Sequence, residues 1–244
     1  GLAREVACLL GRNLDVKILN QASQSAAMGA SKEHDFNLEI KASELCPRYT
    51  GLRLSGVKVG DSPEWLRLRL ESVGLNSINN VVDATNYAML ELGQPLHAFD
   101  AEELKGKKII VDRATVGEKF ITLDGTELKL SGEELMIKDA ERSVCIAGVI
   151  GGKNSGVTEK TTEIFLEAAY FTPQSVRKSM RMHGLNTDSG YRFARGVDPE
   201  GTWLGLHRAA ELIVKVAGGK FLNDVHDFYP TPQKKLPVML KVQT

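Results

Sequence analysis

The carboxylate in the most unusual setting of this sequence is Glu167, which interrupts an otherwise apolar run at residues 164–170. If that run forms a strand with one solvated face, Glu167 simply points to water. If both faces are covered, a buried carboxylate is costly unless it has partners. A buried glutamate with a hydrogen-bond donor beside it could instead bind a ligand hydroxyl. The residues themselves leave these alternatives open.

A second candidate for chemistry is His97, which follows a Gln-Pro-Leu sequence just beyond the predicted end of a helix. We expect it on a surface loop, where a histidine beside a rigid proline is well placed for proton transfer or hydrogen bonding. A lone histidine is nevertheless more often structural. None of the five histidines forms an H-x-x-x-H or H-E-x-x-H pattern, so the sequence predicts no zinc site and no other metal site.

The glycine-rich segment at residues 148–156 resembles a phosphate-binding loop only superficially. A Walker loop needs Ser or Thr directly after Gly-Lys, but Lys153 is followed by Asn154. The segment predicts a tight turn after a strand, in which the backbone comes close to a ligand or to another strand. Cys145, inside that strand, is expected to be a buried thiol, and no G-x-S-x-G motif supports a serine nucleophile.

The elements that must position these residues follow from periodicity and turn signals. The fold class predicted is α+β, with mixed, largely antiparallel sheets and packed helices, because strands and helices alternate without a βαβ repeat. Asp124-Gly125 predicts a hairpin between two of the strands. Helices are expected at residues 2–10, 63–74 with Ser62 as the cap, 83–92, after 172 and 200–218. Strands are expected at residues 36–40, 50–59, 108–112, 120–123, 128–130, 144–150 and 163–168.

Composition narrows the function classes. The chain has 244 residues with 31 basic and 31 acidic side chains, and a net charge of zero argues against general affinity for nucleic acid. Six cations between Arg177 and Arg208 lack obvious acidic partners in the sequence, although a solvated face is the favoured interpretation. Three scattered cysteines favour a reducing compartment. Neither a long apolar run nor a signal peptide is visible.

Four motifs, in order, resemble one family. Residues 77–100 (SINNVVDATNYAMLELGQPLHAFD) resemble the signature of the B3/B4 region in the β subunit of bacterial phenylalanyl-tRNA synthetase, and residues 147–152, 166–171 and 192–198 continue the match. The resemblance implies a B3/B4 editing domain at residues 46–230, preceded at 1–45 by the end of the B1 region and a linker, and followed at 231–244 by the start of the B5 domain. An initial Gly1 and an apparent strand at residues 238–242 suggest a fragment.

The resemblance also implies an activity, which is hydrolysis of misacylated Tyr-tRNA(Phe). Tyrosine exceeds phenylalanine by one oxygen, so an editing pocket cannot exclude phenylalanine by size and must bind the hydroxyl itself. His97 and Asn86 are the implied catalytic residues and would orient a water molecule. The implied substrate-binding residues are Glu167, Gly148, Thr85, Thr187, Ser189 and Ala147. Ser189 stands where family members often carry alanine.

The same resemblance implies a setting. The partners would be tRNA(Phe) and the synthetase α subunit in an α2β2 assembly in the cytoplasm. No cofactor is expected in this chain, since ATP and Mg²⁺ would serve the ligation site on the α subunit. Two alternatives remain, which are a noncatalytic module that docks tRNA or positions the α subunit, and a free-standing editing hydrolase.

Overall fold

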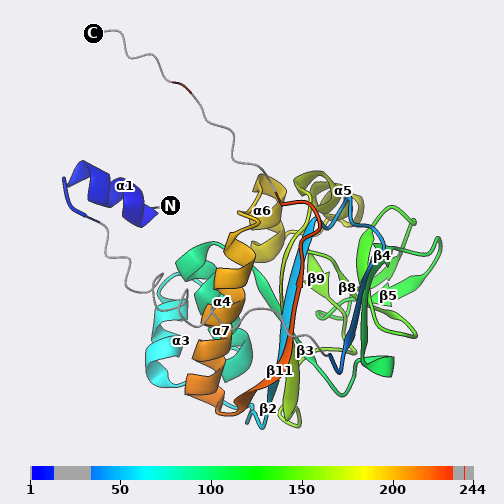
Figure 1. The fold of residues 1–244 in the computed structure, drawn as a ribbon, viewed down its shortest axis with the longest axis horizontal. Helices are drawn as coiled ribbons and strands as arrows, with labels where there is room; N and C mark the ends of the chain where they lie inside the picture. The colour runs from blue at the N-terminus through cyan, green and yellow to red at the C-terminus, as the bar shows by residue number, and fades with distance from the viewer. Residues whose placement is uncertain (1, 14–33, 233–238, 240–244) are drawn as a thin grey trace.

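The structure of the protein is a computed structural model that describes residues 2–13, 34–232 and 239. Figure 1 shows its fold. The helices are α1 (Leu2–Leu9), α3 (Glu64–Glu71), α4 (Asn80–Leu92), the 3₁₀ turn η2 (Lys105–Lys107), α5 (Pro173–His183), α6 (Asp188–Arg195) and α7 (Gly201–Ala217). The strands are β1 (Asn37–Ile40), β2 (Arg48–Ser55), β3 (Leu96–Asp100), β4 (Lys108–Arg113), β5 (Lys119–Ile121), β6 (Glu127–Lys129), β7 (Leu135–Lys138), β8 (Ser143–Ile146), β9 (Ile150–Gly151), β10 (Glu163–Tyr170) and β11 (Lys220–Phe228).

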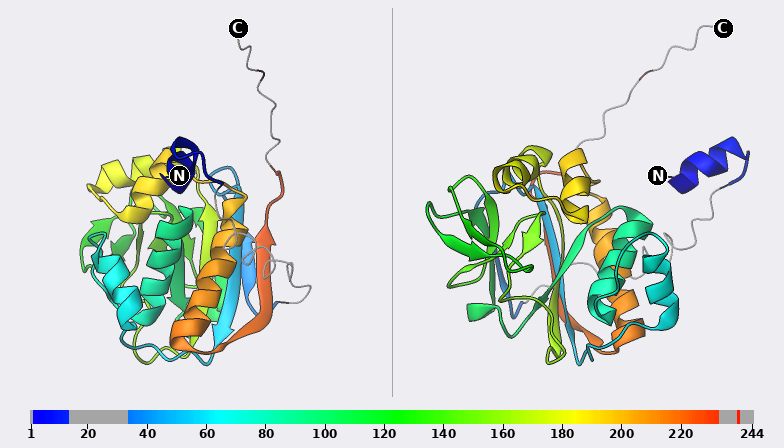
Figure 2. Two further views of the ribbon diagram at one scale, coloured as in Figure 1. Left: turned by 90° about the vertical axis from the view of Figure 1, so that its left-hand side faces the viewer. Right: turned by 180° about the vertical axis from the view of Figure 1, so that it is seen from behind.

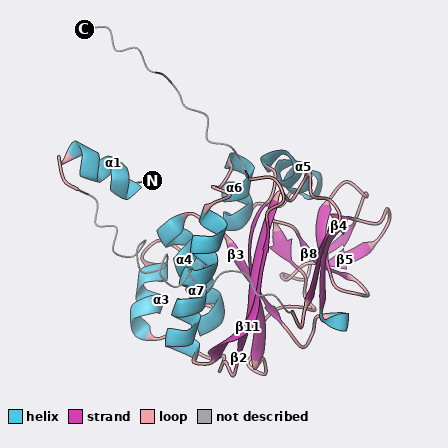
Figure 3. Ribbon diagram, viewed as in Figure 1, coloured by secondary structure: helices cyan, strands magenta, loops and turns pink. Residues whose placement is uncertain are grey.

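The body of the molecule has three layers, which Figures 1 and 3 show from one side. A four-stranded antiparallel sheet, in the order β11-β2-β10-β3, lies in the middle. Helices α4 and α7 cover one of its faces, and α3 packs on α4. A five-stranded sheet, in the order β1-β4-β7-β8-β9, covers the other face. Only the β1–β4 pair in it is parallel, which confirms the predicted α+β class with largely antiparallel sheets.

Strand β10 decides which face each of its side chains enters. It is a central strand whose residues alternate between two apolar cores, as strand geometry requires. Phe165 and Ala169 belong to the core between the two sheets, whereas Leu166 and Ala168 belong to the core under the helices. Glu167 has the parity of Phe165. Its side chain therefore enters the space between the sheets, not solvent.

Helix α4 has clear start and stop signals. The Asn79 side chain accepts hydrogen bonds from the backbone N–H groups of Val81 and Val82, which caps the first turn. The buried Asp83 carboxylate accepts a hydrogen bond from Ser62 and thereby fixes the preceding loop. Gly93 ends the helix in the left-handed conformation, with φ of 80°. This ending directs the chain straight into β3.

Several local predictions were wrong. The N-cap of α3 is Pro63 and not Ser62, whose hydroxyl donates a hydrogen bond to Asp83 of α4. Val73 lies beyond the end of α3 and is exposed. Residues 144–150 do not form one strand, since Gly148 breaks them into β8 and β9. The sequence analysis also missed β3, β7, α6 and β11. The hairpin of β5 and β6 is confirmed.

Two other expectations meet the limits of the described residues. Residues 14–33, within the segment 1–45 that is expected to contain a linker, lie outside them, as does most of the strand expected at 238–242. Strand β1, which precedes the domain boundary expected at residue 46, pairs with β4 inside the five-stranded sheet, and that boundary stays a prediction. Within the described ranges, no helix combines the length and apolarity needed to cross a bilayer.

Candidate functional site

Two of the candidate residues are direct neighbours in the middle sheet. His97 in β3 lies opposite Glu167 in the antiparallel register with β10. Residues directly opposite each other project to the same face of a sheet. The prediction that His97 lies on a surface loop was therefore wrong: it is a strand residue, and its side chain enters the space between the sheets beside Glu167. The two residues are 70 positions apart in the sequence, and this separation hid the pairing from sequence reasoning.

The Glu167 carboxyl group is almost completely buried, with 5% of the residue exposed. The Tyr49 hydroxyl donates to Glu167 Oε2 over 2.6 Å, and among the described residues it is the one group that hydrogen-bonds this carboxyl. Burial raises the pKa of Glu167 to about 8, although the Tyr49 hydrogen bond acts in the opposite direction. The group is therefore mostly protonated at neutral pH, and Oε1 remains free of protein partners.

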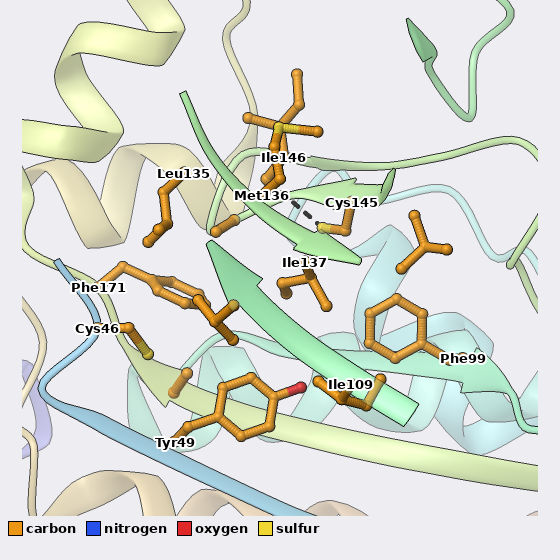
Figure 4. Close-up of a cluster of buried hydrophobic side chains, with 14 of the residues drawn as sticks. Cys46, Tyr49, Phe99, Ile109, Leu135, Met136, Ile137, Cys145, Ile146 and Phe171 are labelled. Atoms are coloured by element: carbon orange, nitrogen blue, oxygen red, sulfur yellow. Dashed lines mark hydrogen bonds between the residues drawn. The ribbon is translucent and has the colours of Figure 1, made fainter. Parts of the chain in front are cut away.

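The surroundings of Glu167 are apolar, and no cationic side chain of the described residues forms an ion pair with its carboxyl group. It projects into a core that contains Cys46, Tyr49, Cys145 and Phe171 (Figure 4). Burial raises the pKa of both thiols well above the ordinary value, and the nearby Glu167 adds to the effect. Cys145 is buried, as predicted. Neither cysteine is therefore a nucleophile at neutral pH.

His97 is held neutral by the same apolar surroundings. Burial lowers its pKa to about 4. Its ring packs edge-on against Phe99, with 4.3 Å between the ring centroids. A Cβ at Gly151 would lie 2.7 Å from the His97 ring, so only glycine at that position leaves room for the imidazole. The Nε2 atom of His97 is buried and has no hydrogen-bond partner among the described residues.

A cavity of about 60 Å³ brings these groups together. His97 and Glu167 form part of its wall with Gly148, Ser189 and Phe193, and the remaining lining residues include Pro95, Cys145 and Gly151. This volume holds about four water molecules.

The opposite wall is the turn between β8 and β9, held by helix α6. Thr187 caps α6 by accepting from the Gly190 N–H, and its hydroxyl donates to the Val149 carbonyl over 2.8 Å. The Ser189 hydroxyl lies 3.4 Å from the carbonyl oxygens of Gly148 and Val149. Figure 2 shows α5 and α6 packed side by side at the end of the sheets where this turn lies. Thr187 thus fixes the wall, whereas Ser189 lines the cavity.

Gly148 is required at this turn for two reasons. Its φ is +71°, a region that other residues rarely adopt. A Cβ there would also lie 2.9 Å from Phe171 and 3.0 Å from Phe193. The predicted close approach of the backbone is confirmed, and side chains of the core are what it approaches. Because Gly151 packs on His97, the segment forms a cavity wall and no phosphate cradle.

Besides Thr187, three candidate residues do not line the cavity. Thr85 and Asn86 lie on α4, which covers the opposite face of the middle sheet, and the Thr85 hydroxyl donates to the Val82 carbonyl. Ala147 is buried beside the turn, and its N–H donates to the Leu135 carbonyl. The structure therefore brings together His97, Glu167, Gly148 and Ser189, with Thr187 behind them. Tyr49 is the contact that sequence reasoning missed. It lies in β2 but just before the strand predicted at residues 50–59, and nothing in the local sequence indicates that it contacts Glu167.

The cations between Arg177 and Arg208 also look different in three dimensions. Lys178 pairs with Glu133, Arg192 with Asp188, and Arg208 with Glu91. For these three cations the prediction that matching acids are lacking was wrong, because two of the acids come from distant parts of the chain. Arg177, Arg181 and Arg195 have no acidic partner among the described residues. This pairing weakens the case for a strongly basic docking face.

The chain is an α+β domain built around a buried Glu–His pair, and it belongs to the B3/4 domain family, which matches residues 45–218. It is similar to the phenylalanine–tRNA ligase β subunit of Bdellovibrio bacteriovorus, with 63% identity over 100% of this chain and 30% of that protein. The β subunit of Geobacter metallireducens is 45% identical over 99% of this chain and 30% of its own length.

The chain thus spans about 30% of the length of these curated relatives. A solved N-terminal fragment of the phenylalanyl-tRNA synthetase β subunit from Pyrococcus horikoshii is also similar, with a TM-score of 0.47 and 14% identity over 90% of this chain and 73% of that fragment.

Proposed function

We propose that this chain is the proofreading part of a phenylalanine–tRNA ligase β subunit and that its cavity hydrolyses Tyr-tRNA(Phe). The observation that carries the proposal is the buried Glu167 carboxyl, which has one oxygen bonded to Tyr49 and the other free, beside the unpartnered nitrogen of His97. A carboxyl held in this way is suited to bind a phenolic hydroxyl. The family to which the chain belongs supports the same assignment.

Selectivity follows from the cost of an unpaired buried polar group. A tyrosine hydroxyl can donate to Glu167 Oε1, or accept from it when the carboxyl is protonated. Phenylalanine offers neither interaction and leaves the carboxyl desolvated and half-paired, which costs about 1–3 kcal/mol. Sites that bond a substrate hydroxyl can reject the analogue that lacks it by roughly 10⁴-fold. Tyr49 would contribute by fixing the direction of the carboxyl plane.

The chemical step is the hydrolysis of an ester. A water oxygen attacks the aminoacyl carbonyl carbon, the bond to the terminal ribose oxygen breaks, and tyrosine leaves with a free carboxyl group. His97, neutral at pH 7, would orient this water through Nε2. With a pKa of about 4 it is a weak base, so positioning rather than full proton abstraction is its proposed role. Asn86, which lies on α4 and outside the cavity, is proposed to contact the part of the substrate that extends beyond it, and the main-chain groups around Ala147 and Gly148 to line the approach.

The setting proposed for this reaction is that of the whole ligase. The partners are tRNA(Phe) and an α subunit in an α2β2 assembly in the cytoplasm. ATP and Mg²⁺ are proposed to act at the ligation site on the α subunit. The cavity described here is smaller than a nucleotide, and among the described residues its wall offers no cationic side chain to a triphosphate.

Deacylation of Tyr-tRNA(Phe) and Phe-tRNA(Phe) by the assembled ligase tests the proposal. We expect Glu167→Ala and His97→Ala each to slow release of tyrosine by about 100-fold, in the range found when one positioning or stabilising group is removed. Glu167→Ala should also remove most of the preference for tyrosine. Aminoacylation with phenylalanine should stay intact in both variants.

The matched control is Glu71→Gln, which changes an exposed carboxylate on α3. It should leave both deacylation rates unchanged. Unaltered hydrolysis of Tyr-tRNA(Phe) in both site variants, with their folds verified by circular dichroism, would reject the assignment and leave the docking or scaffold function.

A further inference from the structure

We propose that His34, Asp224 and His226 form a binding site for one divalent transition-metal ion of the zinc type. Their candidate ligand atoms all lie within 4.8 Å of one another. The site is separate from the cavity of Glu167. It lies at the other edge of the middle sheet, on β11 and the segment that enters β1.

The distances between the ligand atoms resemble those around a bound ion. His34 Nδ1 lies 3.1 Å from Asp224 Oδ1, and His226 Nε2 lies 2.9 Å from the same oxygen. Nitrogen and oxygen ligands bind Zn²⁺ at about 2.0–2.2 Å, which places two ligands of one tetrahedral ion about 3.3 Å apart. The two contacts with Asp224 Oδ1 therefore need shifts of only a few tenths of an ångström, whereas the two imidazole nitrogens, which lie within 4.8 Å of each other, must move closer together.

The His226 nitrogen is the observation that points to a ligand. The residue is 4% exposed, and its buried Nε2 lies 2.9 Å from Asp224 Oδ1 without meeting the geometry of a hydrogen bond to any described residue. Buried polar atoms normally have a partner. A metal ion in the plane of the ring supplies one.

The second ligand shell is already in place around Asp224. Its Oδ2 accepts hydrogen bonds from the Phe36 N–H over 3.3 Å and from Arg53 Nη1 over 3.1 Å, which leaves Oδ1 for the ion. Hydrogen-bonded carboxylates are usual among metal ligands. Arg53 also pairs with Asp35 and Glu163, so three carboxylates surround one guanidinium. This excess of negative charge favours an added cation.

The donor set selects the kind of ion. Two imidazoles and one carboxylate suit Zn²⁺, Co²⁺, Ni²⁺ or Fe²⁺, whereas Mg²⁺ and Ca²⁺ prefer oxygen ligands alone. An open groove lined by His34, Asp35 and His226 gives entry to the site and room for water in the remaining coordination position. One adjustment is needed: the two imidazole rings are stacked, 3.9 Å apart, and the lone pairs lie in the ring planes. The His34 side chain, 31% exposed, has space to turn toward the ion.

Such an ion would crosslink the five-stranded and the four-stranded sheet. His34 leads into β1 of the five-stranded sheet, whereas Asp224 and His226 belong to β11 of the four-stranded sheet. The ligands are 190 residues apart in sequence. An ion that binds only the folded chain stabilises it in proportion to its concentration relative to Kd.

Calorimetric titration of the purified, chelator-treated protein with ZnCl₂ tests the site, with MgCl₂ as the second probe. We expect one Zn²⁺ per chain and no saturable Mg²⁺ binding. His34→Ala should weaken Zn²⁺ binding by at least about tenfold, because even loss of an outer-shell partner costs 10–100-fold. The matched control is His183→Ala, which removes an imidazole that bonds Glu134 elsewhere. It should bind Zn²⁺ like the parent protein.

Two results would overturn the proposal: no saturable Zn²⁺ binding by the parent protein, or equal affinity in His34→Ala and the parent. A measurement without any variant gives an independent answer. Crystals soaked in ZnCl₂ should show an anomalous peak between His34 Nδ1, Asp224 Oδ1 and His226 Nε2. A peak at other residues only would mean an adventitious ion and reject the site.

Discussion

Two histidine–carboxylate clusters occupy opposite ends of one row of the middle sheet. The row runs from His226 in β11 through Gly51 in β2 and Glu167 in β10 to His97 in β3, with each residue opposite the next. At the β3 end the carboxyl group of Glu167 forms no ion pair with any residue that the structure describes, and it bonds only the Tyr49 hydroxyl. At the β11 end Asp224 bonds Arg53 as well as His34.

The difference shows that a charged neighbour, more than burial, sets the ionisation of a carboxyl group. Glu167 and Asp224 are both nearly inaccessible. Burial raises the pKa of Asp224 too, but contact with His226 and the hydrogen bonds from Arg53 and His34 outweigh it, and the pKa falls well below its ordinary value. Glu167 has only the Tyr49 hydroxyl, and its pKa rises to about 8. One cluster is therefore an ion-pair network, and the other is a neutral polar site that can recognise a hydroxyl.

The largest effect expected is on the pH dependence of stability at Glu167. Its pKa is about 8 in the folded chain against an ordinary 4.5, so the folded state holds a proton that the unfolded state has released. The stabilisation is complete below pH 4.5 and is lost as pH rises toward 8, by at most roughly 4–5 kcal/mol. Glu167→Gln should abolish this loss. Urea unfolding at pH 5 and pH 8 measures it, with Glu71→Gln as control.

His97 should act in the opposite direction. Its pKa is about 4 in the folded chain against 6.5 ordinarily, so its contribution is present above pH 6.5 and is lost as pH falls toward 4. The Glu167→Gln variant should therefore still lose stability on acidification below pH 6.5. If the free energy of unfolding of Glu167→Gln falls between pH 5 and pH 8 as steeply as that of the parent protein, Glu167 is ionised in the folded chain and the prediction fails.

Removing the cation from the β11 cluster should have the next largest effect. Arg53→Met leaves the buried Asp224 without its cationic partner, and breaking a buried ion pair on one side costs about 3–5 kcal/mol. Urea unfolding at pH 7 measures the loss. The control is Arg67→Met, whose exposed pair with Glu71 on α3 should contribute less than about 1 kcal/mol. Equal losses in the two variants would contradict the contrast between the clusters.

The midpoint of the row offers a change that reaches both ends. A Cβ at Gly51 would lie 2.5 Å from the Phe165 ring, which packs between the two clusters against Phe36 and His226. Gly51→Ala should cost about 1–3 kcal/mol through overpacking. Gly60→Ala, where a Cβ meets nothing within 4 Å, is the control and should stay within about 0.5 kcal/mol. An unchanged free energy of unfolding in Gly51→Ala would mean that the core between the two clusters can rearrange to accommodate the added methyl group.

The smallest effect expected is at the hydrogen bond that orients Glu167. Tyr49→Phe leaves a buried carboxyl without its donor and should cost about 1–2 kcal/mol. Because that bond lowers the pKa of Glu167 in the folded chain, the loss of stability with rising pH should begin at the same pH in the variant but continue to a higher pH. Tyr191→Phe, on the exposed face of α6, is the control. An unaltered pH profile would mean that Tyr49 does not influence the carboxyl.

Local signals in the sequence predicted much of the fold because they act over short distances. The Asp124-Gly125 hairpin, the Gly93 stop of α4 and the Pro173 start of α5 are all observed. Strand β3 was missed because a proline and a short apolar stretch after a helix also read as a loop. Strand β11 was missed since its burial is irregular and its register with β2 shifts between Phe221 and Val225.

The sequence by itself determined the family, the α+β class and the identity of the residues that could do chemistry, since motifs, turns and periodicity are local. It left open whether Glu167 faces water, and its histidine spacing predicted no metal site. Only the tertiary structure decided where the Glu167 side chain lies, and it brings together the residues of the proposed metal site. Pairing of β10 with β3 and β2 puts Glu167 beside His97 and under Tyr49, and the approach of β1 to β11 brings His34 to Asp224 and His226. Burial and ionisation depend on neighbours far away in the chain, which no local pattern records.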